Sequence, residues 1–358
     1  MNLTTRLTLW LHRQWQRRGL FSMTLRPLSA LASWLVRRKE QKIRHDPTAS
    51  YRCPVAVVVV GNIIVGGAGK TPVVQALATQ LRALGWTPGI ISRGYGVAVG
   101  PEPRVGQGEL PAAQFGDEPA LIAAQTQAPI AVHPKRVLAA QALLRAFPHV
   151  DLIISDDGLQ HLALQRDLEV VVQDARGVGN GLMLPAGPLR EPPTRLRRAD
   201  WLITQLNTDQ TQPDTPHPQD PARCLSMTLA PHRLEHLASG RCIDWAEWRD
   251  RQGETAVQAL AAIGQPERFF SMLRLNGLTL SQAHARPDHA ALSRQDFADL
   301  GTGPILITRK DAVKCRNMND PRLWAVDVLP VFTRPDWIQE LDGQLRLRRA
   351  ASSPFTRS

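Results

Sequence analysis

The sequence predicts an α/β fold with a doubly wound, mostly parallel sheet and a second, smaller α/β domain. One observation behind this prediction is the unbroken apolar run 55–60, which is typical of a strand buried on both faces. Another is the alternation of such runs with helical segments, because parallel strands need a crossover between them. A third is the glycine-rich turn that follows the first strand and leads into a helix.

Strand-like and helix-like segments follow one another along the chain. The expected strands of the first domain are 55–60, 87–92, 151–155 and 168–173, and its expected helices are 72–84, 119–125 and 137–147. Residues 206–222 are rich in Pro, Asp, Gln and Thr, which predicts a surface loop. We therefore expect four parts: a basic amphipathic helix over 1–48, a larger domain over 49–222, a second α/β domain over 223–346 with strands 259–263, 304–308 and 323–328, and a disordered tail over 347–358.

Composition excludes several classes of protein. The 358 residues exceed one ordinary domain, and a hydrophobic content of 43% excludes a disordered chain. The four cysteines are far apart and form no CxxC pair, which excludes a disulfide framework and a zinc site and fits a reducing cytoplasm. Residues 1–50 hold ten Lys and Arg against two acids, so they carry +8 of the net +11. The rest is nearly neutral, and we expect no nucleic-acid partner.

The N-terminal basic segment mixes Trp, Phe and Leu with its arginines. No apolar run approaches the roughly 20 residues that span a bilayer, and basic residues interrupt it too often for a signal peptide. This pattern suits a helix that lies in the membrane interface and meets anionic headgroups. The alternative is an amphipathic helix packed on the core with solvated arginines.

A glycine-rich segment, 61–72, joins the first strand to the first helix. Its glycines let backbone N–H groups curl around an anion, and the helix N-terminus adds partial positive charge. A lysine here reaches the β- and γ-phosphates and a Ser or Thr hydroxyl ligates Mg²⁺, so the segment predicts a P-loop NTPase-like core that binds ATP and Mg²⁺. Ile64 stands where the strict pattern has glycine, and a turn that binds nothing is the alternative. The expected nucleotide-binding residues are Val65, Gly66, Gly67, Ala68, Gly69, Lys70, Thr71 and Pro72.

Two adjacent carboxylates, Asp156 and Asp157, end the strand 151–155. Carboxylates at the carboxyl end of a central strand lie in the crevice where such sheets bind ligands, and there they can hold Mg²⁺. Asp-Asp-Gly is also good turn chemistry, which is the alternative. Beside a phosphate loop we favour the metal site, and we expect Thr71, Asp156, Asp157 and Gln160 to form it.

Two other acidic motifs are weaker candidates. Asp117 and Glu118 precede a helix, where they could act on an attacking hydroxyl or simply complement the helix dipole. Asp288 and His289 could form a proton-transfer pair or an ordinary surface turn. The pattern alone favours the structural interpretation of both.

Three arginines, Arg93, Arg136 and Arg190, lie in loops rich in glycine or proline. Arginine in a rigid loop suits the recognition of phosphate or carboxylate. A solvated arginine is the alternative for each, and we expect at least one of them to contact an anion.

Taken together, these motifs resemble those of the tetraacyldisaccharide 4′-kinases of lipid A biosynthesis. The resemblance extends from the basic start to about residue 330 and rests on eight strings in order: VGNIIVGGAGKTP, ISRGYG, GDEPALIA, HPKR, SDDGLQH, NGLMLPAGPLREP, PDH and TRKDAVK. It implies transfer of the γ-phosphoryl group of ATP to the 4′-hydroxyl of a tetraacylated glucosamine disaccharide 1-phosphate. It also implies a peripheral enzyme on the cytoplasmic face of the bacterial inner membrane, with the acylated disaccharide and the anionic membrane surface as partners.

The resemblance assigns roles to individual residues. It implies that Lys70 contacts the transferring phosphates, that Asp117 takes the proton from the 4′-hydroxyl, and that His289, beside Asp288, completes a dyad with Asp117. It implies phosphate contacts for Arg136 and Arg190 and nucleotide-base contacts near Lys310 and Asp311. Three positions depart from the family pattern, Ala68, Arg286 and Arg309, and they affect packing near the Asp-His pair and the base contacts.

Other functions remain open on the sequence. One is a P-loop kinase that acts on a soluble substrate. A partitioning-type nucleotide switch would need a lysine where Val65 stands, and a GTP switch is faintly suggested by Thr-Arg-Lys-Asp at 308–311. We expect no obligate protein partner.

Overall fold

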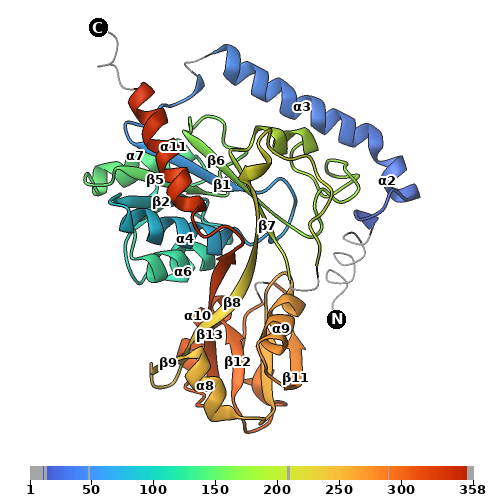
Figure 1. Cartoon of the computed structure of the whole chain (residues 1–358), viewed down its shortest axis with the longest axis vertical. Helices are drawn as coiled ribbons and strands as arrows, with labels where there is room; N and C mark the ends of the chain where they lie inside the picture. Colours follow the sequence, from blue (N-terminus) through green and yellow to red (C-terminus); the bar gives the residue numbers. More distant parts are fainter. Residues whose placement is uncertain (1–10, 12–13, 47–48, 208–209, 289, 353–358) are drawn as a thin grey trace. The chain divides into compact units, whose positions relative to one another are not determined.

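The computed structural model describes residues 11, 14–46, 49–207, 210–288 and 290–352, which divide into two compact units (Figure 1). Unit 1 comprises Met1–Leu206, Thr211–Met227 and Phe332–Ser358. Unit 2 comprises Asn207–Gln210 and Thr228–Val331. Apart from the short segment Asn207–Gln210, the chain passes from one unit to the other within the long strands β8 (Cys224–His236) and β13 (Leu323–Phe332).

Unit 1 is built on a mostly parallel sheet. Its strands run in the order β8-β7-β6-β1-β5-β2-β4-β3, and only the edge strand β3 is antiparallel to its neighbour. Their bounds are β1 Ala56–Gly61, β2 Pro88–Ser92, β3 Arg104–Gly106, β4 Ile130–Val132, β5 Leu152–Asp156, β6 Leu168–Asp174 and β7 Trp201–Gln205. The strand order reverses at β1, and such a switch point is where open α/β sheets bind ligands.

Both faces of this sheet are buried. In β1, Val58 and Val60 belong to one hydrophobic cluster, and Val57 and Val59 belong to another. This arrangement explains the unbroken apolar run, because alternate side chains of a strand point to opposite faces. The helices of unit 1 after β1 are α4 Lys70–Ala83, α5 Ala112–Phe115, α6 Asp117–Thr126, α7 Arg136–Ala146 and α11 Trp337–Ser352, with the 3₁₀ helix η2 Pro193–Arg198. The predicted doubly wound α/β fold is confirmed.

The N-terminal segment of unit 1 forms α2 (Leu20–Thr24) and α3 (Arg26–His45). One face of α3 packs on the core through Ala32 and Val36. An adjoining face leaves Leu31 and Leu35 about half exposed. The described helices include none that is both long and apolar enough to cross a membrane. The predicted amphipathic character is therefore present, while residues 1–10, 12–13 and 47–48 of the predicted segment lie outside the described residues.

Unit 2 is a smaller α/β unit. Its parallel strands run in the order β11-β10-β12-β13, followed by β8, with β9 antiparallel to β8. Its elements are β9 Cys242–Asp244, α8 Trp245–Gln252, β10 Val257–Ala261, α9 Pro266–Leu275, β11 Leu280–Ala285, η4 Arg294–Phe297, β12 Ile305–Thr308, α10 Arg309–Cys315 and η5 Arg316–Met318, besides most of β8 and β13. Two buried clusters form its core.

The C-terminal segment departs from the prediction. The second domain was expected to extend to residue 346, with a disordered tail from 347, whereas unit 2 ends at Val331 and α11 continues to Ser352. Trp337 and Leu341 of α11 are fully buried in the same cluster as Val58. Apolar residues four apart give α11 a face that must be covered, so the chain returns to unit 1. Residues 353–358 lie outside the described part of the chain.

Candidate active site

The phosphate loop and the Asp-Asp pair meet at one edge of the sheet. β1 and β5 are parallel neighbours, and Val60 is in register with Asp156. The residues that follow both strands therefore emerge side by side, at the carboxyl edge where such sheets bind ligands. This pairing brings together two motifs separated by about 90 residues in the sequence, as the sequence predicted.

The loop has the backbone of an anion-binding turn. Gly66 and Gly69 have φ values of 98° and 84°, which a side chain would strain. Gly69 is also the N-cap of α4, and a Cβ atom there would overlap the side chain of Gln205. Lys70 is the first residue of α4, with its side chain 15% exposed and its Nζ atom 3.5 Å from Asp157 Oδ1.

Asp157 is the most strongly paired carboxylate of the site. Arg190 donates to both of its oxygens, at 3.0 and 2.9 Å, and Lys70 completes the set. Burial by itself would raise the pKa of Asp157, but Lys70, Arg190 and Arg136 outweigh it and hold the pKa well below its usual range. The residue has φ +50°, a conformation uncommon for a non-glycine residue that is often retained at functional sites.

Asp156 is buried and differs sharply from its neighbour. Its carboxylate accepts a hydrogen bond from Ser92 Oγ at 3.0 Å, and of the residues described no cation lies within 4.0 Å of it. Burial, and then the charge of Glu118, raises the pKa of Asp156 to about 6, although Lys70 opposes the shift. Strongly shifted pKa values of this kind cluster at functional sites.

Arg136 is buried behind the two acids, and its predicted phosphate contact stays a prediction. It is 2% exposed, and its guanidinium donates to the carbonyl oxygens of His133, Asp156 and Asp157 at 3.0 to 3.4 Å. Its hydrogen bonds hold the strand end that carries the two acids. Burial lowers the pKa of Arg136 to about 10 despite the nearby acids. Arg93, by contrast, is exposed.

Gln160 lies beside the loop that begins at Asn62. Its Nε2 atom donates to Asn62 O at 3.3 Å and to Glu191 Oε1, which leaves its oxygen as the atom able to face a metal or its water. Glu191 is held in turn by Arg195 at 3.0 Å. The neighbouring His161 has its pKa lowered to about 4, first by burial and then by Arg136 and Lys39.

The donors near the phosphate loop fit Mg²⁺. Thr71, Asp156, Asp157 and Gln160 offer hard oxygen atoms from adjoining elements, as Mg²⁺ prefers. Within the described ranges no group of three or more His, Cys, Asp and Glu residues could hold a metal by itself.

The acids of the Gly-Asp-Glu-Pro motif begin α6, after Gly116 with φ 93°. Glu118 is close enough to Asp156 to raise its pKa, so this helix start borders the site. Asp288 belongs to unit 2, where Lys310 Nζ lies 3.4 Å from its Oδ1. His289 lies outside the described residues, so the dyad with Asp117 stays a prediction.

The Thr-Arg-Lys-Asp segment has a structural role in unit 2. Thr308 is the N-cap of α10, and its hydroxyl exchanges hydrogen bonds with Asp311. Asp311 is fully buried and accepts from Ala262 N at 3.0 Å. Because Asp311 is fully buried, its carboxylate is not accessible to a guanine base, so the faint GTP-switch interpretation loses its support.

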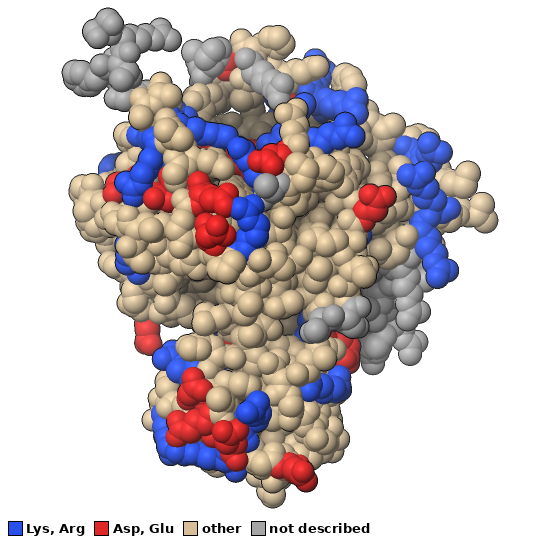
Figure 2. Space-filling model, in the orientation of Figure 1, with Lys and Arg blue, Asp and Glu red and all other residues tan. Residues whose placement is uncertain are grey.

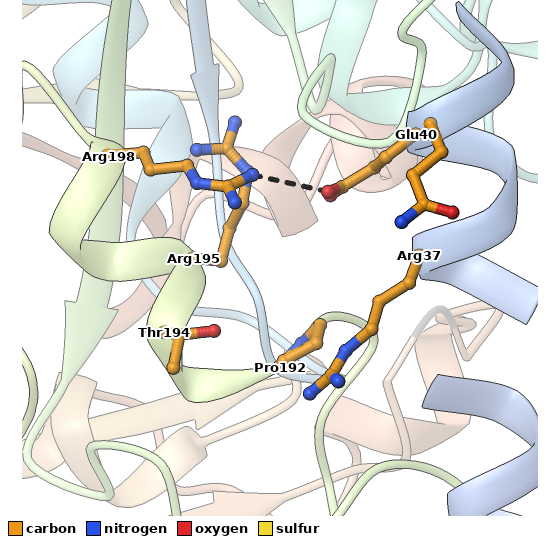
Figure 3. Close-up of a pocket in the computed structure, with 7 residues that line it drawn as sticks. Arg37, Glu40, Pro192, Thr194, Arg195 and Arg198 are labelled. Atoms are coloured by element: carbon orange, nitrogen blue, oxygen red, sulfur yellow. Dashed lines mark hydrogen bonds and ion pairs between the residues drawn. The ribbon is translucent and has the colours of Figure 1, made fainter. Parts of the chain in front are cut away.

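Sequence reasoning missed several residues that support the site: Asn62, Ser92, Arg176, Glu191 and Arg195. Arg195 also lines a cavity of about 320 Å³ between α3 and η2, shown in Figure 3, together with Arg37, Glu40, Gln41, Pro192, Thr194 and Arg198. The ion pair between Glu40 and Arg198, at 3.2 Å, fastens α3 to this region. The only sequence signal that could have identified Asn62 and Ser92 as site residues is their position at the ends of predicted strands.

Known proteins resemble this chain over nearly its whole length. It matches the family described as tetraacyldisaccharide-1-P 4′-kinase over residues 21–346. It is 50% identical over 345 residues to a tetraacyldisaccharide 4′-kinase of Bordetella petrii, covering 95% of this chain and 96% of that protein. It is 45% identical over 325 residues to one of Herminiimonas arsenicoxydans, covering 88% and 90%. Its fold is similar to the crystal structure of LpxK from Aquifex aeolicus in complex with ATP, with a TM-score of 0.73, 24% identity and coverage of 91% and 99%. The chain belongs to the tetraacyldisaccharide-1-P 4′-kinase family.

Proposed function

We propose that the protein transfers the γ-phosphoryl group of ATP to the 4′-hydroxyl of a tetraacylated glucosamine disaccharide 1-phosphate. The observation that carries this proposal is the register of β1 with β5, which sets a phosphate loop beside Asp156 and Asp157 in a member of this family. The 4′-oxygen attacks the γ-phosphorus, the bond to the β,γ-bridging oxygen breaks, and ADP leaves.

Different residues of unit 1 would bind the phosphates of ATP and its Mg²⁺. Loop N–H groups and Lys70 would bind the phosphates, with Thr71, Asp156, Asp157 and Gln160 around Mg²⁺, whose charge would neutralise the phosphate oxygens. In the structure the carboxylate of Asp157 neutralises the charges of Lys70 and Arg190. It thereby takes the place that the negative charge of a bound phosphate would take. Binding of ATP would release these two cations toward phosphate.

The acceptor hydroxyl needs a base. We assign Asp117 to take the proton from the 4′-oxygen, with His289 as its partner and Asp288 beside it. We also assign contacts with phosphates of the two substrates to Arg93, which is exposed, and Arg190, which is half-buried. Arg136 would act indirectly, by holding the main chain of the two metal-binding acids.

A membrane-interface role for α2 and α3 is part of this proposal. Leu20, Leu28, Leu31, Trp34 and Leu35 are each more than half exposed along these two helices. Figure 2 shows Lys and Arg side chains in blue along the same segment, with tan side chains among them. An apolar face bordered by cations suits the surface of an anionic membrane, here the cytoplasmic face of the bacterial inner membrane, where an acylated substrate resides.

The activity is tested with the purified full chain, ATP, Mg²⁺ and the tetraacylated disaccharide 1-phosphate in detergent. We expect a product with a phosphate at the 4′-position and equimolar ADP. GTP in place of ATP should give much less product. Folded protein that releases no 4′-phosphorylated product, or that prefers a soluble sugar, would refute the assignment.

The membrane role is tested by sedimentation with vesicles of phosphatidylglycerol and phosphatidylethanolamine. The double variant Leu31→Glu/Leu35→Glu should bind at least about tenfold more weakly, because two exposed leucines lose their apolar contact with lipid. Leu329→Glu/Val331→Glu changes two equally exposed apolar residues of unit 2 and serves as the matched control. Equal vesicle binding by both variants would favour a kinase of soluble substrates.

A further inference from the structure

Two side chains outside residues 65–72 hold the main chain of the phosphate loop. Asn62, fully buried after β1, donates from Nδ2 to Gly66 O at 3.1 Å. Arg176, which follows β6, donates from Nη2 to Gly67 O at 3.1 Å. Two successive carbonyl groups of the phosphate loop are thus fixed by residues from other parts of unit 1.

Fixing a carbonyl also fixes the next N–H group. The peptide unit is planar and trans, so the N–H of residue i+1 points opposite to the C=O of residue i. The bond from Asn62 therefore sets the N–H of Gly67, and the bond from Arg176 sets the N–H of Ala68. In the described part of the chain, neither of these N–H groups has a protein acceptor. Ala68 is 1% exposed, and unpaired N–H groups are uncommon in such places unless a ligand completes them.

Arg176 is itself rigidly held. Its guanidinium makes bonds of 2.7 to 3.0 Å to both oxygens of Asp174, and the N–H of Arg176 donates to Asp174 Oδ1 at 2.9 Å. Asp174 is fully buried at the end of β6, the strand next to β1. The support for Gly67 is therefore anchored in the sheet.

From these contacts we infer that Asn62 and Arg176 are positioning residues that preorganise the phosphate loop, turning the N–H groups of Gly67 and Ala68 toward the nucleotide's β-phosphate before it binds. The inference rests on the proposed nucleotide site. Neither residue is among the expected nucleotide-binding residues 65–72, and Arg176 lies more than 100 residues after them. A preset array of N–H groups binds an anion without the cost of ordering the loop at that moment.

A matched control lies in unit 2. Asp320 and Arg322 repeat the Asp174–Arg176 pattern, with a main-chain bond of 2.9 Å and guanidinium bonds of 3.0 and 2.7 Å. Arg322 donates to the carbonyl groups of Leu300 and Gly301 instead of those of the phosphate loop. Replacing either arginine by lysine keeps a cation beside the aspartate but removes the planar fork that also reaches a carbonyl.

The experiment compares the binding of ADP and AMP, by competition with a fluorescent ADP analogue, in wild type, Arg176→Lys and Arg322→Lys. We expect Arg176→Lys to weaken ADP binding about tenfold and to leave AMP binding nearly unchanged, because only ADP carries the β-phosphate. Arg322→Lys should leave both affinities unchanged. Asn62→Ser, tested in the same way, should repeat the selective loss if Arg176→Lys fails to fold.

The outcomes separate the inference from the proposed function. Wild-type binding of ADP that is lost in Lys70→Ala supports the nucleotide site. If that holds while Arg176→Lys and Asn62→Ser both keep the wild-type ratio of ADP to AMP affinity, the positioning role is refuted alone. Equal losses for ADP and AMP, or the same loss in Arg322→Lys, would refute it as well. Wild type that binds no ADP would overturn both.

Discussion

Each unit holds a cluster of buried carboxylates among cations, but the two clusters pair their charges differently. In unit 2, Arg309 contacts both Glu235 and Asp327, the latter at 2.9 Å. Arg316 and Arg233 add longer contacts to the same two acids, at 3.6 and 3.5 Å. Each acid of this cluster therefore has a cation on more than one side.

In unit 1 the cations are shared unevenly between the two adjacent carboxylates. Asp157 takes both Arg190 and Lys70, while adjacent Asp156 is left with the hydroxyl of Ser92. Asp156 consequently has its pKa raised to about 6 by burial and by Glu118. A buried carboxylate without a partner costs stability, and such a cost persists where the site is completed by something other than the protein. The acids of the unit 2 cluster are therefore paired within the protein, whereas Asp156 of unit 1 has no described cation in contact with it, as expected of the metal ligand that we propose.

The largest expected effect is that of Lys70→Ala. Lys70 reaches Asp157 in the structure, and we place it on the transferring phosphate during the reaction. Loss of one such charge in a preorganised site lowers kcat about 10²- to 10³-fold. Arg190 remains on Asp157, so the free energy of unfolding should change by less than about 1 kcal/mol. Steady-state kinetics and chemical denaturation measure the two quantities, and normal turnover would remove Lys70 from the site.

The variant Asp156→Asn should stabilise the ligand-free protein while it lowers activity. The folded-state pKa of about 6 lies above the unfolded value of 3.8, so wild type loses stability as pH rises from about 4 to 6 and carries the full cost above 6. That cost is about 3 kcal/mol, from 1.36 kcal/mol for each pKa unit. Asn keeps the shape and the contact with Ser92 without the charge.

Denaturation of both proteins from pH 4 to 8 checks this expectation. The variant's advantage should be near zero at pH 4 and greatest above pH 6. A variant that is less stable than wild type at pH 7 would show that Asp156 is not a strained carboxylate, and the contrast between the two units would disappear.

The parts of the fold and site that the sequence predicted are those governed by local pattern. Three features can each be recognised from a few consecutive residues: the apolar run of β1, the glycine-rich loop and the acids after β5. Their meeting followed from one general rule about parallel strands. Strands β3 and β4, of three residues each, were missed because so short a run has no detectable period.

The rest depended on contacts distant in sequence. Ser92 matters because β2 is paired with β5, and Arg176 matters because β6 is paired with β1. The residues near Ser92 and Arg176 in the sequence do not predict these strand pairings. Trp337 and α11 return to unit 1 for the same kind of reason, since their apolar face finds its partner far back along the chain. The Thr-Arg-Lys-Asp segment was misleading because a helix cap and a base-reading loop use the same residue types.

A smaller effect is expected for Arg309→Met in unit 2. The side chain of Arg309 is 18% exposed, and its loss removes its ion pairs with Glu235 and Asp327. We expect a loss of about 2 kcal/mol in the free energy of unfolding, below the range for a fully buried pair because solvent still reaches the cluster. The kcat of the folded variant should stay within about twofold of wild type. A kcat loss as large as that of Lys70→Ala would give this cluster a catalytic role and break the comparison.

The smallest effect separates contacts within the unit 2 cluster. Arg316 reaches the same Glu235 as Arg309, but at 3.6 Å and with its side chain half exposed. Exposed pairs of that kind contribute little, since water and salt screen them, so Arg316→Met should cost less than about 0.5 kcal/mol. Combining it with Arg309→Met should cost more than the sum of the two single variants, because Glu235 then loses both of the arginines described in contact with it. If the losses in free energy of unfolding, measured by urea denaturation, were strictly additive, the two arginines would act on Glu235 independently. The acids and arginines of unit 2 would then not form the mutually paired network that distinguishes this cluster from the one in unit 1.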